Sequence, residues 1–396
     1  MKDNIKTLWT VAAMTCGLLT TALSAGNCGE DPCRPTPPPP PPVKQCPEEP
    51  KCVERPAPPC VKPPEPKCAP RCDTPPAGMI MDDCQNMGCK VITPNAGPRV
   101  CMGADVFVTA DFILWTYRQE GMEFAMTGST GTVTSQGRVF EPSFGLEPGF
   151  KVGLGLNLGH DGWDVFAEYT WLTTNATRKV RDNNTMTNLW NGGSQAQVLT
   201  GSWDSDFNVI DLELGRNFFV SQYLTLRPHY GLKGSWQSQD FKVVGDVNNI
   251  LTGNLLSRRT MKQGFDYWGI GIRTGMDTAW HFTKCWSIYG NFALSALWSG
   301  FDIDRKDETF NNTNGVTTQN INTENDFKTV VPVLEIALGL RWEMWFSNDD
   351  YHFGIDAGWE EQVWWGMNRY IVMSQPQRDN GDLTFQGLTL KFRFDF

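Results

Sequence analysis

Small, polar and charged residues, with charges of both signs, recur at every second position in segments whose intervening positions are apolar. Side chains along a β-strand point alternately to its two faces, so such a segment has one charged face and one apolar face. If the strands close into a barrel with the charges inside, these charges can select small hydrophilic solutes by size and sign. They can also form a structural ionic network that fills a narrow barrel, and the two roles can coexist. The residues predicted to line the interior are Asp111, Asp164, Glu168, Asp211, Glu213, Arg227, His229, Lys233, Arg273, Asp277, Glu335, Arg341, Asp356, Lys391 and Arg393.

His229 is the one histidine that this pattern places in the middle of the interior. Across the short turn at 220–222 it should face Asp211 or Glu213, which would be an acid–base pair. A buried histidine between carboxylates and Arg227 is more commonly a member of a satisfied ionic network. The chain contains no Gly-x-Ser-x-Gly and no His-Glu-x-x-His motif. The other histidines, at 160, 281 and 352, fall at or near short turns. The sequence therefore predicts no catalytic residue, no enzymatic activity and no cofactor.

Cysteines supply a second kind of chemistry near the N-terminus. Ten of the chain's twelve cysteines are Cys28, Cys33, Cys46, Cys52, Cys60, Cys68, Cys72, Cys84, Cys89 and Cys101. Thiols in an exported segment are expected to form disulfides. A metal site is disfavoured because the segment has no histidine and only one weakly zinc-like pair, Cys68 and Cys72. A passive spacer whose thiols matter little is the third interpretation. Cys285 lies beside a short turn, where it would pair with this segment or remain inert.

The N-terminal part of the chain divides into a leader and an arm. Lys2 and Lys6 precede an apolar stretch from Leu8 to Leu23, followed by small residues, so residues 1–25 are predicted to be a cleaved secretory signal. Residues 26–103 form the arm, which holds 21 of the 26 prolines. That density of proline favours extended polyproline II structure over a sheet. After the signal, no run of 18 apolar residues follows, so a membrane would have to be crossed by strands.

Residues 104–396 carry the alternation, and its last nine residues show it most clearly. Leu388, Leu390, Phe392, Phe394 and Phe396 share one face, opposite polar and charged residues. An edge strand of this kind would aggregate in water, whereas a barrel strand in lipid is satisfied on both faces. Phe392, Phe394 and Phe396 are predicted to form the signal that the barrel-insertion machinery recognises.

The connections between the segments alternate between short and long. Short turns are predicted near 159–162, 220–222, 281–283 and 347–350, and long polar loops near 119–143, 173–205, 237–265, 299–327 and 366–382. This alternation is typical of an outer-membrane barrel, with short turns in the periplasm and long loops outside. We therefore predict an all-β fold, a transmembrane antiparallel up-and-down β-barrel of about ten strands. The range is ten to twelve, because residues 121–140 could add a hairpin.

Tryptophan spacing agrees with a membrane barrel. Trp286 and Trp298 share a face twelve residues apart, as do Trp268 and Trp280. At about 3.3 Å per residue and a tilt near 40–45°, twelve residues rise roughly 28–30 Å, close to the apolar band with its aromatic girdles. A soluble β-sandwich is the alternative, but it would need a second sheet to cover the apolar row of every strand.

The residues also resemble a known family. Val106-Phe107-Val108-Thr109-Ala110-Asp111-Phe112-Ile113-Leu114-Trp115, with Glu120-Gly121-Met122-Glu123-Phe124-Ala125, is similar to the opening strand and loop of the Legionella-type major outer membrane proteins, found also as MOMP-like proteins in chlamydia-related bacteria. The stretches 140–155 and 163–172 resemble that family too. The resemblance covers about 105–396 and implies an outer-membrane barrel that forms a passive pore, without catalytic residues. The cysteine-rich arm departs from the family pattern and resembles, in kind, the disulfide-linked envelope proteins of chlamydiae.

The expected function is that of an outer-membrane porin for passive diffusion of ions and small hydrophilic solutes. The alternative is a structural or adhesive cross-linked envelope protein with a plugged barrel. Expected partners are outer-membrane lipid, the barrel-insertion machinery, and other Cys-rich envelope proteins or further copies of the chain through disulfides. A net charge of -10 and a pI near 5 argue against nucleic acid.

Overall fold

The computed structural model describes residues 96–100, 103–128, 137–159, 161–249, 252–372 and 381–396. The predicted signal peptide, the ten N-terminal cysteines and almost all of the arm lie outside these ranges. In the part of the chain that the model describes, no helix is long and apolar enough to cross a membrane. The predictions for the signal and the disulfides therefore stay predictions.

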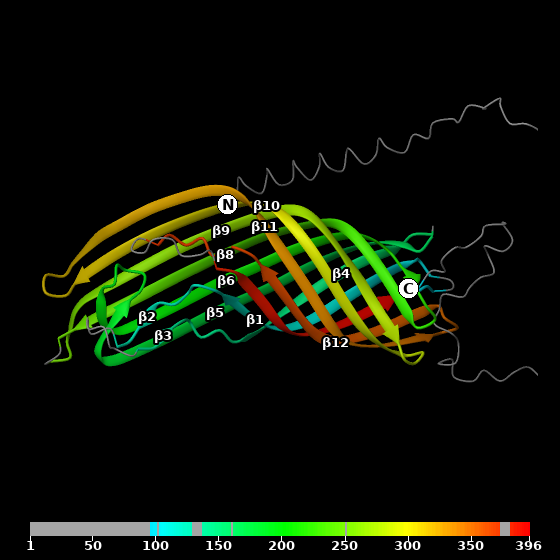
Figure 1. Ribbon diagram of the computed structural model, residues 1–396, viewed down its shortest axis with the longest axis horizontal. Helices are drawn as coiled ribbons and strands as arrows, with labels where there is room; N and C mark the ends of the chain where they lie inside the picture. The colour runs from blue at the N-terminus through cyan, green and yellow to red at the C-terminus, as the bar shows by residue number, and fades with distance from the viewer. Residues whose placement is uncertain (1–95, 101–102, 129–136, 160, 250–251, 373–380) are drawn as a thin grey trace, which may run out of the picture. The chain divides into compact units, whose positions relative to one another are not determined.

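Ten long antiparallel strands form a closed ring (Figure 1). The ring closes because β1 pairs with both β4 and β13. This confirms the all-β barrel predicted from the alternation. The ten strands are β1 (Val106–Gln119), β4 (Leu146–Asn157), β5 (Trp163–Asn188), β6 (Gln195–Arg216), β8 (Leu224–Asn248), β9 (Leu255–His281), β10 (Trp286–Asn311), β11 (Val316–Phe346), β12 (Tyr351–Trp364) and β13 (Leu383–Asp395).

Three further strands are only two residues long. They are β2 (Ala125–Met126), β3 (Val139–Phe140) and β7 (Phe218–Phe219). β2 pairs with β3 and with the far end of β5, so this small hairpin lies beside the ring without joining it. The count is therefore ten, and the extra hairpin considered for 121–140 does not widen the barrel.

The predicted loops at 173–205, 237–265 and 299–327 are wrong in extent, because most of their residues are strand. β8 runs on to Asn248 and β9 resumes at Leu255, so only a short tip separates them. The alternation continues through these polar stretches with its sense reversed. On β8, Leu232 is exposed and Lys233 buried, whereas farther along Phe241 is buried and Lys242 exposed. Strands were predicted from apolar rows on the outward face. In the loop half the outward face is polar, so these strands resemble polar loops.

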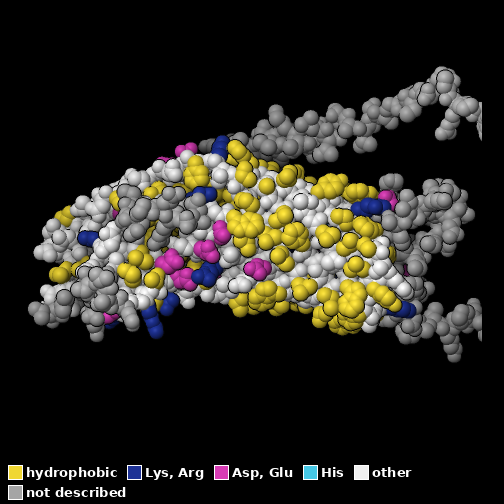
Figure 2. Space-filling view, in the orientation of Figure 1, with side chains coloured by type: hydrophobic (Ala, Val, Ile, Leu, Met, Phe, Trp, Pro, Cys, Tyr) yellow, Lys and Arg dark blue, Asp and Glu magenta, His cyan; other side chains and the backbone are white. Residues whose placement is uncertain are grey.

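The reversal divides the barrel into two halves. We call the end with the short turns the turn end and the opposite end the loop end. Outward residues of the turn half are apolar, and Figure 2 shows hydrophobic side chains gathered over this half, toward the right of the view. Trp268, Trp280, Trp286 and Trp298 all point outward, with 37 to 54% of each side chain exposed. The band between these tryptophans is the surface that faces hydrocarbon.

Phe392 and Phe394 lie on the outward row of β13, beside the start of β1, and Phe396 follows the last residue of that strand. The main chain of Phe396 pairs with Val106, and its ring lies 5.9 Å from that of Phe394. Their proposed role in assembly remains a prediction.

Candidate functional site: the barrel interior

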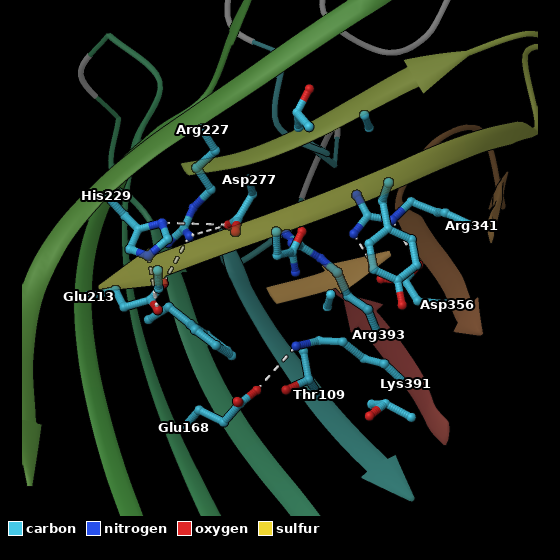
Figure 3. Close-up of a pocket in the computed structure, with 18 of the residues that line it drawn as sticks. Thr109, Glu168, Glu213, Arg227, His229, Asp277, Arg341, Asp356, Lys391 and Arg393 are labelled. Atoms are coloured by element: carbon cyan, nitrogen blue, oxygen red, sulfur yellow. Dashed lines mark hydrogen bonds and ion pairs between the residues drawn. The ribbon is translucent and has the colours of Figure 1, made fainter. Parts of the chain in front are cut away.

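The turn half of the barrel encloses a cavity of about 210 Å³, which we call the polar chamber. Its wall is built from inward positions of most strands of the ring. It extends from Asn217 and Trp345, beside the short turns, to Phe207 and Gln362 near the middle of the barrel. Figure 3 shows charged side chains of both signs converging on this space. Every interior residue predicted from the sequence lines the chamber or contacts a residue that does.

Arg227 is the centre of the first ion-pair group. From β8 it reaches Asp164 on β5, with Nη2 2.6 Å from Oδ1, and Glu213 on β6 at 2.9 Å. It also lies 2.9 Å from Asp277 on β9. Gly215 makes this possible, because a Cβ there would stand 2.5 Å from the Arg227 Nε atom. One guanidinium therefore connects four strands.

A second group spans the chamber. Lys233 on β8 lies 2.8 Å from both Asp211 and Glu335, and Glu335 belongs to β11. Arg273 on β9 lies 2.6 Å from Glu335 and 3.0 Å from Glu213. Because β8 and β11 are not neighbours in the ring, these pairs cross the interior. They leave little free width at this level.

A third group lies on the opposite wall. Lys151 on β4 bonds Glu360 on β12 at 2.7 Å, and Lys391 on β13 lies 3.1 Å from Glu168. Lys391 is also 3.6 Å from Asp111. Lys151 and Glu360 were not among the residues predicted to line the interior, although the alternation places both there. Lys151 shares the inward phase of the glycines that follow it, and Glu360 follows the outward Trp359.

The turn end carries two smaller groups. Arg341 donates two hydrogen bonds to Asp356, at 2.7 and 2.8 Å. His352 is fully buried, with Nδ1 2.6 Å from Asp395, which also accepts a hydrogen bond from Arg393. The prediction placed His352 near a turn but gave it no partner. Asp395 supplies one because it is the residue paired with His352 across β12 and β13.

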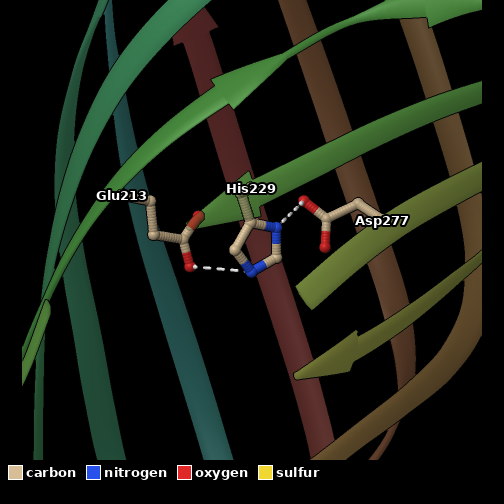
Figure 4. Close-up of side chains that lie close together, drawn as sticks. All are labelled: Glu213, His229 and Asp277. Carbon is tan, nitrogen blue, oxygen red and sulfur yellow. Dashed lines mark ion pairs between the residues drawn. The ribbon is translucent and has the colours of Figure 1, made fainter. Parts of the chain in front are cut away.

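His229 lies between two carboxylates, as Figure 4 shows. Its Nε2 is 3.5 Å from Glu213 and its Nδ1 is 3.8 Å from Asp277, and neither nitrogen makes a hydrogen bond. Of the two partners predicted, the structure brings Glu213 to it. The three residues could offer ligand atoms to a metal ion. Arg227 and Arg273 already donate to these carboxylates, and two cationic groups at this distance disfavour a divalent ion.

The loop half of the interior is filled by aromatic side chains. Tyr117 and Phe207 each pack against Phe385, with ring centroids 4.4 and 4.3 Å apart. Such contacts continue through the whole set, which we call the aromatic cluster, and the polar chamber ends where it begins. The sequence analysis did not predict it. Its aromatic members are Trp115, Tyr117, Phe124, Trp190, Trp203, Phe207, Phe241, Phe265, Tyr267, Phe301, Trp364, Tyr370 and Phe385.

Part of the β12–β13 connection also lies inside the barrel. We call residues 366–372 the inner segment. Met367 and Tyr370 are buried in the aromatic cluster, and Ile371 and Val372 pack against it. Burial raises the pKa of the Tyr370 hydroxyl well above its usual range, so this hydroxyl stays a neutral donor.

Residues 96–100 lie against the turn end of the barrel. Arg99 donates a hydrogen bond of 2.5 Å to the main-chain oxygen of Leu158, and Asn157 donates one to Pro98. Ala96 and Pro98 belong to the wall of the polar chamber. The chamber is therefore bounded by this strap at one end and by the aromatic cluster at the other.

The chain was compared with known proteins. The model of the Legionella pneumophila major outer membrane protein precursor family matches residues 101–396. No curated protein matches.

Solved structures show similarity over most of the chain. The outer membrane protease OmpT from Escherichia coli is 10% identical, with a TM-score of 0.37 over 76% of this chain and 99% of that one. The major outer membrane protein from Thermus thermophilus is 10% identical, with a TM-score of 0.27 over 73% and 98%. Ail, the attachment invasion locus protein of Yersinia pestis, is 9% identical, with a TM-score of 0.22 over 74% and 99%.

The family match covers the whole ring of strands and most of the chain, in agreement with the lipid-facing band and the charged interior. The chain is a β-barrel of the outer membrane and belongs to the Legionella major outer membrane protein family.

Proposed function

We propose that this barrel is a narrow diffusion pathway for ions and small hydrophilic solutes, and that the conformation described is its closed state. The observation that supports the proposal is the polar chamber, a cavity of about 210 Å³ lined by charges in the half of the barrel that lies in the membrane. Rings of charged side chains are what selective aqueous pores use.

The interior of the loop half supports this interpretation by contrast. Aromatic side chains fill it, which shows that an apolar core can fill a barrel of this width. Buried ion pairs are weak sources of stability, because desolvation offsets much of their attraction. A barrel needed only as a solid body gains little from the charges that Arg227, Lys233 and Arg273 bring together. Charges beside a water-filled space are explained more directly by the passage of polar solutes.

The chamber also suggests a direction of selectivity. Nine carboxylates and seven lysine or arginine side chains line it, which is an excess of two negative charges when all are ionised. Because the pairs are intimate, this excess should give a weak preference for cations rather than a strict one.

Conductance of the refolded full-length protein in a planar bilayer tests the proposal. Discrete ohmic steps from protein with the heat-modifiable mobility of a folded barrel are expected, with a reversal potential shifted toward cations in a salt gradient. Silence from folded protein across many membranes would contradict it.

The second candidate is a structural envelope protein with a plugged barrel. The aromatic cluster and the strap at 96–100 favour it, because together they close both ends of the chamber.

We propose, for either function, that the cysteines of the arm form intermolecular disulfides. High-mass species on non-reducing gels that collapse with dithiothreitol are expected. A monomer without reductant, carrying stoichiometric zinc, would contradict this.

A further inference from the structure

The inner segment is hydrogen-bonded to the rest of the barrel at Gly366, Asn368, Tyr370 and Ile371, and at Ile371 the bonds are to its main chain. Gln263, an inward residue of β9 with 1% of its surface exposed, makes two hydrogen bonds there. Its Nε2 donates to the Ile371 oxygen at 3.1 Å, and its Oε1 accepts from the Ile371 nitrogen at 2.8 Å. The side-chain amide therefore pairs with the segment as a neighbouring strand would.

Arg305 adds a charged contact at the same position. It is completely buried on β10, and its Nη1 donates to the Ile371 oxygen at 2.6 Å. Its Nη2 donates at 2.7 Å to the oxygen of Trp190, at the tip between β5 and β6, and to Asp307. One guanidinium thus fixes two segments of the loop end, with its charge balanced by the carboxylate two residues along its own strand.

A row of polar side chains leads from the polar chamber to this contact. Successive inward positions of β8 after Lys233 are Ser235, Gln237 and Gln239, and none has more than 3% of its surface exposed. Gln239 accepts a hydrogen bond of 3.2 Å from the Tyr370 hydroxyl in the inner segment. Hydrogen-bonding groups therefore cross the aromatic cluster along a single strand.

We propose that the inner segment, residues 366–372, is a gate, and that its withdrawal opens a route along Ser235, Gln237 and Gln239 past Gln263 and Arg305. The inference rests on the proposed pore function. In the closed barrel the side chains of Gln263 and Arg305 are the hydrogen-bond partners of the Ile371 main chain. When the segment leaves, water can satisfy both side chains and the main chain. Removing these partners leaves the buried main chain of Ile371 unsatisfied in the closed state only, which favours the open state.

The first test weakens the gate. Gln263→Met keeps the length of the side chain and removes both hydrogen bonds to Ile371. In single-channel records of the full-length protein, the ratio of open to closed time should rise roughly tenfold. The control is Gln319→Met, the same change at an exposed position of β11 that belongs neither to the inner segment nor to the route, and its ratio should match the wild type.

A double variant weakens the gate in a second way without leaving a buried charge that could prevent folding. Arg305→Met with Asp307→Leu removes the buried pair together, so neither charge is left without its partner. It should shift the open ratio in the same direction as Gln263→Met. Only protein with the heat-modifiable mobility of a folded barrel is measured.

The second test locates the route. Gln239→Glu places a negative charge on it while keeping the acceptor for Tyr370, so the reversal potential in a potassium chloride gradient should move toward cations. Ser238→Glu places the same charge on the outward face one residue away and should leave the reversal potential unchanged.

The outcomes separate the two proposals. If the wild type and every folded variant are silent, the pore function fails and the gate fails with it. If the wild type conducts but neither Gln263→Met nor the Arg305→Met/Asp307→Leu variant changes the ratio of open to closed time, the gate is overturned while the pore stands. If Gln239→Glu and Ser238→Glu shift the reversal potential equally, the route is overturned.

Discussion

The two halves of this barrel are built from the same strands with opposite use of their faces. On the turn half of β8 the apolar Leu232 faces outward and Lys233 inward, and on the loop half Lys242 faces outward and Phe241 inward. The register between strands runs through the change without a break at these positions. The difference therefore lies in what surrounds each half and not in the sheet itself.

The surroundings explain the exterior of each half. Lipid around the turn half demands an apolar exterior, and the interior of this half holds the charges that line the polar chamber. Inside a narrow barrel those charges must pair, and the three ion-pair groups are the result. Around the loop half the outward carboxylates and lysines belong in water, so the interior becomes an ordinary hydrophobic core. Within one closed sheet, the outward faces follow the surrounding solvent, while the interior is ionic around the polar chamber and aromatic beyond it.

The largest expected effect comes from emptying the aromatic interior. Phe241 is buried and packs on Trp190 and Tyr370. Phe241→Ala should lower the free energy of unfolding by about 3–5 kcal/mol, because the cavity forms inside the aromatic cluster and not at the wall of the polar chamber. Phe292→Ala, on the lipid face, should cost distinctly less, since acyl chains can occupy the space. Urea titrations of protein folded into lipid vesicles measure both, and equal losses would contradict a packed core in the loop half.

The next effect comes from breaking the ionic interior. Lys233→Met leaves Asp211 and Glu335 without the ammonium that lies 2.8 Å from each. We expect a loss of about 3 kcal/mol, toward the lower end for a broken buried pair because the chamber admits water. The control is Lys262→Met, an exposed lysine of the loop half, whose loss should stay within about 0.5 kcal/mol. Similar stabilities for the two variants would mean that the interior charges contribute nothing to the fold.

A charge introduced on the outward face should affect the stability of the two halves differently. Ile272 is 69% exposed on the lipid face of β9, between Trp268 and Trp280. Ile272→Lys should lower the stability in vesicles by about 2–3 kcal/mol. Ser238→Lys, on the outward face above the tryptophans and beside Asp206 and Asp266, should be nearly neutral. An equal loss from both variants would show that lipid covers the loop half as well.

The sequence alone predicted much of this molecule, and the two halves show where it stopped. In the turn half each strand repeats one rule, apolar outside and polar inside. The pattern of each strand therefore predicted which of its charges point inward, and the number of such strands predicted a ring of ten. In the loop half the rule is reversed, and Trp203, Phe241 and Phe301 looked like apolar residues scattered in polar loops. Their common location is a property of ten strands closing around one axis.

The inner segment is the second feature that the sequence did not reveal. Residues 366–372 were read as part of a polar surface loop, yet Tyr370 and Ile371 enter the barrel. Their environment depends on Gln263 and Arg305, which lie about sixty to one hundred residues away along the chain. No local pattern encodes such a contact, because Gln263 and Arg305 belong to β9 and β10, which are not neighbours of β12 or β13 in the ring.

The smallest effect is expected at an exposed ion pair of the loop half. Arg258 and Asp246 face each other across β8 and β9, with Nε 2.6 Å from Oδ1, but about half of the arginine side chain is exposed. Water and salt screen such a pair, so Arg258→Met should lower the stability by no more than about 1 kcal/mol, and raising the salt concentration should reduce even that difference. The interior pair of Lys233 and Asp211 is shielded from salt, so the loss caused by Lys233→Met should change little over the same range. Urea titrations of both variants and the wild type at low and high salt compare them directly. If salt weakened the interior pair as strongly as the exterior one, the chamber would be in open exchange with bulk solution, and the strap and the aromatic cluster would not close it.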